Sequence, residues 1–154
     1  MKDFIESLLP DGKYDYFSQG PGQHSYYFCG DIETFTATYA ITINEEDNYI
    51  FYNIIYPYDI PEDKIDRVLE YISRINYGDV FGAFIVDHVD PCVSYHASIP
   101  LGSNREENQQ YFATYLNHGQ SVMEEFHEGL LDVFGGKQPL EVLTKMGAAV
   151  TQIK

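Results

Sequence analysis

The feature that most constrains the fold is a regular alternation of apolar and polar residues between Glu33 and Asn44. Threonines fill most of the polar positions, and the apolar positions are Phe35, Ala37, Tyr39, Ile41 and Ile43. A period of two is typical of a β-strand with one buried face, and β-branched residues suit the other face. A polar turn and a second strand, Tyr49 to Tyr56, follow. The two segments predict an antiparallel hairpin with helices covering one face.

Helical spacing of apolar residues marks the segments on either side of this hairpin. Lys2 to Leu9 predicts a short helix, and a longer one begins at Pro61 and is ended by Gly78. Two strands, Phe81 to Val86 and Val93 to Ile99, come next. A long helix with a broad apolar stripe then runs from Asn104 to Phe134.

The order of these elements is helix, strands, helix, strands, long helix. That order predicts a single α+β domain over residues 1–154, with an antiparallel sheet and helices packed on one face. Ser103 and Glu106 have the spacing of a capping box at the start of the long helix. The length and the apolar content, 44% of 154 residues, suit one globular domain.

The charge balance restricts the partners. Nine Lys and Arg stand against 24 Asp and Glu, a formal net charge of −15. Such a chain repels nucleic-acid phosphates and anionic membrane surfaces, so neither is expected as a partner. A partner is expected to be basic or neutral, although the charge can also serve solubility alone. Acidic residues near the N-terminus and the absence of a long apolar run predict a cytoplasmic protein.

The sequence shows no strong catalytic motif. It has neither Gly-x-Ser-x-Gly nor a phosphate-binding loop, so no enzyme activity and no cofactor are expected. One cluster leaves an alternative open, because Asp87, His88 and Asp90, with His96 nearby, are residue types that bind metals. The alternative is a small metal-binding protein or enzyme that uses this turn. A turn rich in Asp and His is more often simply solvated.

Aromatic residues give the best indication of a binding surface. The chain has 14 tyrosines and 10 phenylalanines, and tyrosine is favoured at protein interfaces. The strand from Tyr49 is apolar on both faces, so a partner or a second subunit is expected to cover the face that the helices leave free. The predicted partner or homodimer surface consists of Tyr49, Phe51, Tyr52, Tyr56 and Tyr58. These side chains could instead complete an ordinary core.

A recognisable pattern lies where the second helix ends and the next strand begins. Its residues are Asn76, Tyr77, Gly78, Gly82 and Phe84, followed by Asp87, Val93 and Tyr95. The pattern resembles the YbjN family, described as bacterial sensory transduction regulators, and the resemblance is best over residues 61–133. It implies a fold similar to that of type III secretion chaperones, which are small acidic proteins that dimerise and hold an extended segment of a partner. It implies no enzyme activity and no cofactor.

The expected function is therefore that of a non-enzymatic binding or regulatory protein that is chaperone-like, dimeric and holds a basic or apolar protein or peptide. A structural subunit of a larger assembly is a further alternative. The sequence leaves open whether Cys29 and Cys92, both expected as free thiols, are close in space.

The residues of the pattern also have a direct physical interpretation. Gly78 is predicted to end the helix with a positive φ, and Asn76 to bond to nearby backbone. Gly82 is predicted to mark a close approach of two backbone segments, and Phe84 to lie in the core. On this interpretation, Asn76, Gly78, Gly82 and Phe84 shape a bend in the chain and perform no reaction.

Overall fold

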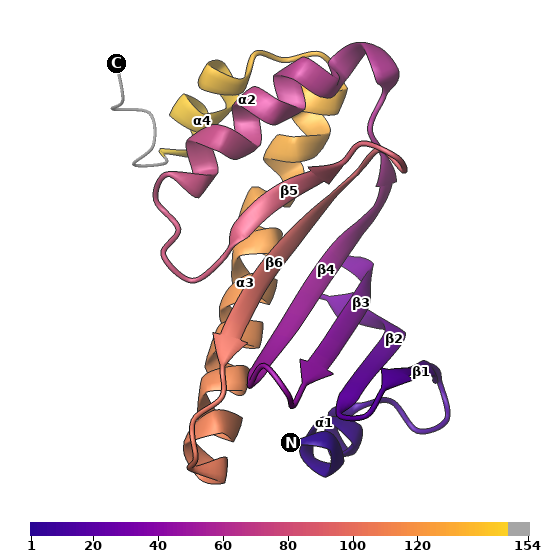
Figure 1. Cartoon of the computed structure of the whole chain (residues 1–154). Helices are drawn as coiled ribbons and strands as arrows, with labels where there is room; N and C mark the ends of the chain where they lie inside the picture. Colours follow the sequence, from indigo (N-terminus) through magenta and orange to yellow (C-terminus); the bar gives the residue numbers. More distant parts are fainter. Residues whose placement is uncertain (148–154) are drawn as a thin grey trace.

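The computed structural model describes residues 1–147, and it confirms the predicted fold class and order of elements (Figure 1). A six-stranded antiparallel sheet is combined with four helices. The elements, in chain order, are α1 (Lys2–Leu8), β1 (Tyr14–Gly20), β2 (Gln23–Ile32), β3 (Phe35–Asn44), β4 (Tyr49–Asp59), α2 (Ile65–Asn76), β5 (Ala83–Asp87), β6 (Cys92–Pro100), α3 (Arg105–Phe134) and α4 (Pro139–Met146).

The strands lie in the order β1-β2-β3-β4-β6-β5, and every neighbouring pair is antiparallel. The chain crosses from β4 to β5 through α2, and β6 then inserts between β4 and β5. β1 and β5 are therefore the edge strands. β5 is the shorter of the two, and its first residue, Ala83, is paired with His96 in the middle of β6.

One face of the sheet packs against the helices, and α3 runs behind β6 and β5 in Figure 1. The alternation in β3 is confirmed, because its five apolar side chains are all buried. Tyrosines on this face also bond to α3. The hydroxyl of Tyr52 donates to the carbonyl of Tyr115 at 2.6 Å, and that of Tyr56 donates to the carbonyl of Met123 at 2.5 Å. Each phenol thus buries its ring and still satisfies its polar atom.

Two local predictions need correction. Asn104, rather than Ser103, caps α3, because its side-chain oxygen accepts from the N–H groups of Glu106 and Glu107. After Pro61 the chain first forms a 3₁₀ turn, Glu62–Lys64, before α2 begins. Within residues 1–147 no helix combines the length and the apolar content that a membrane crossing requires.

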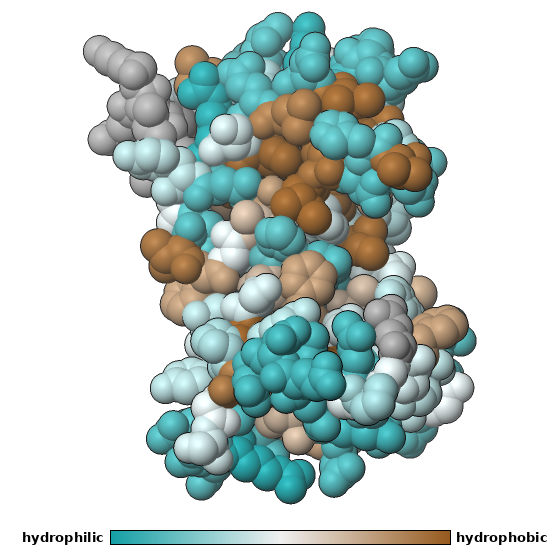
Figure 2. Space-filling view, in the orientation of Figure 1, coloured by the Kyte–Doolittle hydropathy of each residue, from teal (hydrophilic) through white to brown (hydrophobic). Residues whose placement is uncertain are grey.

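The opposite face of the sheet, here called the open face, carries no described helix. Its central side chains alternate with the buried ones and form rows across β2 to β6. They are Ser25, Tyr27, Cys29, Thr38, Ala40, Thr42, Phe51, Asn53, Ile55, Ala83, Ile85, Ser94, His96 and Ser98. Figure 2, in the orientation of Figure 1, shows apolar side chains gathered around α2 and β5, with mostly hydrophilic side chains lower down.

Candidate functional site

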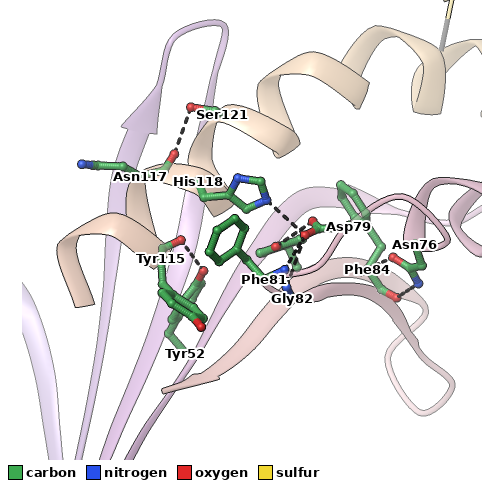
Figure 3. Close-up of polar contacts among 11 residues, drawn as sticks. Tyr52, Asn76, Asp79, Phe81, Gly82, Phe84, Tyr115, Asn117, His118 and Ser121 are labelled. Atoms are coloured by element: carbon green, nitrogen blue, oxygen red, sulfur yellow. Dashed lines mark hydrogen bonds and ion pairs between the residues drawn. The ribbon is translucent and has the colours of Figure 1, made fainter. Parts of the chain in front are cut away.

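The residues singled out by the sequence pattern lie where the chain reverses between α2 and β5. The Asn76 side chain ties the two elements together, since its Nδ2 donates to the carbonyl of Phe84 at 2.8 Å and its Oδ1 accepts from the Phe84 N–H at 2.7 Å (Figure 3). Phe84 itself is buried. The amide of Asn76 therefore replaces the strand partner that the backbone of Phe84 would otherwise need.

The two glycines of the pattern differ in what they do. Gly78 does not have a positive φ, so that prediction is wrong; its N–H continues the helical turn by donating to the carbonyl of Ile75 at 3.0 Å. Gly82 is a place of close approach, as its position in a strand-like segment suggests. A Cβ on Gly82 would meet the backbone carbonyl oxygen of His96 and lie 2.6 Å from the hydroxyl oxygen of Tyr95.

Asp79 is the centre of the turn's polar contacts, and its side chain is only 5% exposed. Its Oδ1 accepts from the N–H of Phe81 at 2.8 Å and lies 3.1 Å from Nε2 of His118 on α3. Its Oδ2 accepts from the hydroxyl of Tyr95 on β6 at 2.7 Å. In Figure 3 the rings of Phe81 and His118 lie side by side next to this carboxylate. One carboxylate thus joins the turn, the sheet and α3.

The electrostatics of the turn agree with an ionised Asp79. Burial, which raises the pKa of this carboxyl, is the largest single influence, but the hydrogen bonds from Phe81, Tyr95 and His118 outweigh it, and the pKa is lowered. Burial also raises the pKa of the Tyr95 hydroxyl, and its bond to Asp79 raises it further. Tyr95 therefore stays protonated as the donor. Asp79 thus holds the turn against β6 and α3 through Phe81, Tyr95 and His118, and we call these four residues the Asp79 latch.

Replacing Asn76 with alanine tests the tie between α2 and β5. The change removes two hydrogen bonds and leaves the backbone of Phe84 without partners, so we expect a loss of about 2 kcal/mol of unfolding free energy. Urea denaturation measures it. Asn117→Ala, at an exposed position on α3, is the matched control, expected to change stability by less than about 0.5 kcal/mol. Equal effects of the two changes would contradict this role of Asn76.

A mainly apolar pocket of ≈ 420 Å³ adjoins the turn. It lies between α3 and the end of β6, and the ring of Phe81 forms one side, in edge-to-face contact with Tyr115 at 5.1 Å between ring centroids. Its lining residues are Phe81, Ile99, Pro100, Tyr111, Thr114 and Tyr115. Tyr111 is half exposed. The latch therefore positions one wall of a pocket that is open to solvent.

The predicted partner surface on β4 is divided by the structure. Tyr52 and Tyr56 are 0% and 2% exposed and face α3, so for these two the prediction of a partner surface is wrong. They lie on the same face of β4 as Ile50 and Ile54, which the helices also cover. Phe51 lies on the open face, in edge-to-face contact with His96 at 5.7 Å between ring centroids. Tyr49 and Tyr58, at the two ends of the strand, are partly exposed.

The Asp87–Asp90 turn does not have the geometry of a metal site. Oδ1 of Asp87 accepts from the N–H groups of Val89 and Asp90, which closes the turn on itself. Across residues 1–147, no group of three or more His, Cys, Asp or Glu side chains is arranged to hold a metal ion. Cys29 and Cys92 are free, on strands separated by β3 and β4.

Sequence reasoning missed Asp79 and His118. An acidic residue three positions after Asn76 and just before a tight turn is a signal for side-chain bonding to local N–H groups. That signal could have identified Asp79. His118 lies 39 residues further along the chain and gives no such local signal.

Comparison with known proteins assigns the family. Neither the search of curated proteins nor that of solved structures found a match. Residues 2–128 match the family model YbjN, described as "Putative bacterial sensory transduction regulator". The match includes both elements joined by Asn76, the Asp79 latch and most of α3. The chain therefore belongs to the YbjN family.

Proposed function

We propose that this protein is a non-enzymatic regulator that acts as a homodimer and holds a protein or peptide partner. The family description supports a regulatory role. In the polar cluster around Asp79 both carboxylate oxygens accept hydrogen bonds, and these bonds hold the turn to β6 and α3. A role in binding is the reading that the geometry favours.

The observation that carries the proposal is the composition of the open face. Its central side chains include no Asp, Glu, Lys or Arg, although the chain has a formal net charge of −15. The acids of the strands lie at the margins of the sheet, at Asp15, Asp31, Asp59 and Asp87. Depletion of charge at the centre with a charged surround is the usual composition of a protein interface.

A second copy of the chain is the occupant proposed for this face. Two molecules that each carry −15 repel one another over most of their surface, and contact costs least where neither presents charge. The face is also suited to twofold symmetry, since Ala40 and Asn53 lie in its middle row with uncharged neighbours on both sides.

The oligomeric state tests this proposal. We expect light scattering after size exclusion to give twice the chain mass of 17.7 kDa at micromolar concentration. Ala40→Glu, at the centre of the open face, is expected to give the single-chain mass, since it would bury two carboxylates against each other. Thr36→Glu is the matched control on the same strand and face. It lies at the exposed margin, so the dimer is expected to persist.

Two results would contradict the proposal. A wild-type protein that stays monomeric at these concentrations would remove the second copy from the open face. A dimer that survives Ala40→Glu would place the subunit interface elsewhere. Far-ultraviolet circular dichroism of both variants checks that any change in mass does not come from unfolding.

A further inference from the structure

The end of β6 forms an unpaired edge in the sheet. β5 begins at Ala83, opposite His96, so β6 continues to Pro100 with no strand beside it on that side among the described residues (Figure 1). The chain before Ala83 does not cover this edge, because the Asp79 latch turns Phe81 toward α3. The latch thereby creates a gap in the sheet next to the apolar pocket. We call the free edge and the pocket together the notch.

The direction of the backbone groups at this edge can be derived. In an antiparallel strand the N–H and C=O of one residue point to the same side, and successive residues alternate. The N–H of Leu101 donates to Asn48, next to β4, so the odd-numbered residues at this end of β6 point toward β4. The carbonyl of His96 lies against Gly82 on the opposite side, in agreement. Ser98 must then direct both its N–H and its C=O to the free edge.

These groups lack partners in the chain. Among the described residues, no loop or turn donates to or accepts from the backbone N–H and C=O of Ser98. The pairing of β5 with β6 begins only at Ala83 and His96, so β5 does not reach Ser98 either. Pro100 adds a carbonyl to the same edge but has no N–H, which limits the edge to a short pairing. An edge of this kind binds an extended segment by adding it as a further strand.

The pocket supplies a position for one side chain of such a segment. Along an added strand, alternate side chains face the same way, and on the helix side they would point toward α3. There the pocket of ≈ 420 Å³ is lined by three aromatic rings, by Ile99 and Pro100, and by the side chain of Thr114. This lining suits an apolar or aromatic side chain.

Charge favours basic residues flanking that side chain. The chain has a formal net charge of −15, and Glu107 precedes the pocket residue Tyr111 by one turn of α3. Glu106 and Glu107 occupy the first turn of α3 on the same side, with Arg105 as the one base beside them. A segment passing Pro100 therefore meets an excess of negative charge.

We infer that the notch binds an extended peptide segment as an additional strand on β6, with an apolar or aromatic side chain in the pocket and Lys or Arg beside it. The inference rests on the proposed function in that it identifies the site and the chemistry of the peptide partner. It does not depend on the open face, which lies on another side of the sheet and takes the second copy.

Selection from a library tests this inference without knowledge of the natural partner. Random peptides of about eight residues, long enough to cross the notch, are displayed on phage and selected on the full-length protein. We expect enriched sequences with an apolar or aromatic residue flanked by Lys or Arg. Thr114→Trp fills the pocket from an exposed position and is expected to weaken binding of the selected peptides by about tenfold or more. Ser121→Trp, two turns further along α3, is the control and should leave binding unchanged.

Backbone modification distinguishes strand addition from simple apolar contact. N-methylation of the peptide residues that face β6 should abolish binding, whereas N-methylation of the residues between them should not. In the free protein the Ser98 amide should exchange with solvent far faster than those of Ala97 and Ile99, which face β4, and peptide should slow it. Failure to enrich any peptide, or equal binding by the wild type and Thr114→Trp, would overturn the inference. Loss of peptide binding in Ala40→Glu but not in Thr114→Trp would place the peptide on the open face. That result would overturn the inference about the notch and would still support the proposal that the protein binds a peptide partner.

Discussion

Gly82→Ala is expected to destabilise the protein by about 3 kcal/mol or more, since overpacking against atoms that cannot move is among the costliest single changes. The added methyl group would meet the carbonyl oxygen of His96, which belongs to the backbone of a central strand, and the hydroxyl of Tyr95 at 2.6 Å. The first atom belongs to the backbone, and the second ends a buried ring whose hydroxyl is bonded to Asp79, so neither can move away easily. Relief requires β5 to move away from β6, which would also separate Asp79 from Tyr95.

Thermal and urea denaturation measure this effect. The control is Gly102→Ala, where the nearest atom to an added methyl group is Oδ1 of Asn108 at 3.8 Å, so the expected change is within about 0.5 kcal/mol. If Gly82→Ala proved as stable as Gly102→Ala, the close contact between β6 and the turn would not exist in solution. The notch, whose wall is formed by Phe81, would then also lose its basis.

The contrast between Gly78 and Gly82 shows which parts of the turn the sequence could predict. Both residues stand in one short pattern, but Gly78 was expected to need a positive φ and Gly82 to mark a close approach of two backbone segments. Atoms of β6 do lie against Gly82, whereas Gly78 needs no special backbone angle. A short stretch of sequence shows that a glycine is present, but which atoms it approaches depends on which strands pair. The insertion of β6 between β4 and β5 cannot be predicted from such a stretch.

The tyrosines of β4 show a similar limit. Alternation correctly predicted the strand, and parity with Ile50 and Ile54 assigns Tyr52 and Tyr56 to the helix-covered face. The sequence could not show that backbone carbonyl groups of α3, 63 and 67 residues away, accept hydrogen bonds from the hydroxyls of Tyr52 and Tyr56. With those acceptors unknown, a polar hydroxyl suggested a surface position. Strands and helices could thus be predicted from periodicity, whereas contacts between distant elements could not.

Asp79→Ala is the second change from which we expect a large effect. It removes an acceptor that serves the N–H of Phe81, the Tyr95 hydroxyl and the His118 ring, and it leaves the buried phenol without a partner. Hydrogen bonds to a charged group contribute about 1.5–3 kcal/mol each at most, and they are not additive, so we expect a total loss of about 3 kcal/mol. Tyr95→Phe, which removes one of these bonds, should cost less.

The pH dependence of Asp79→Asn identifies the charge as the cause. Because the folded protein lowers the pKa of Asp79, ionisation of this group stabilises the fold at pH values above its unfolded pKa of about 4, and that stabilisation is lost as the pH falls through the lower folded value. Asparagine cannot ionise and lacks this contribution at every pH. The difference in unfolding free energy between wild type and Asp79→Asn should therefore be largest above about pH 5 and shrink steadily below about pH 4. Subtracting the two proteins cancels the titration of the other carboxylates, which the variant retains. A difference that stays constant down to pH 3 would mean that the latch works through shape and neutral hydrogen bonds, and that the negative charge of Asp79 does not hold Phe81 against α3.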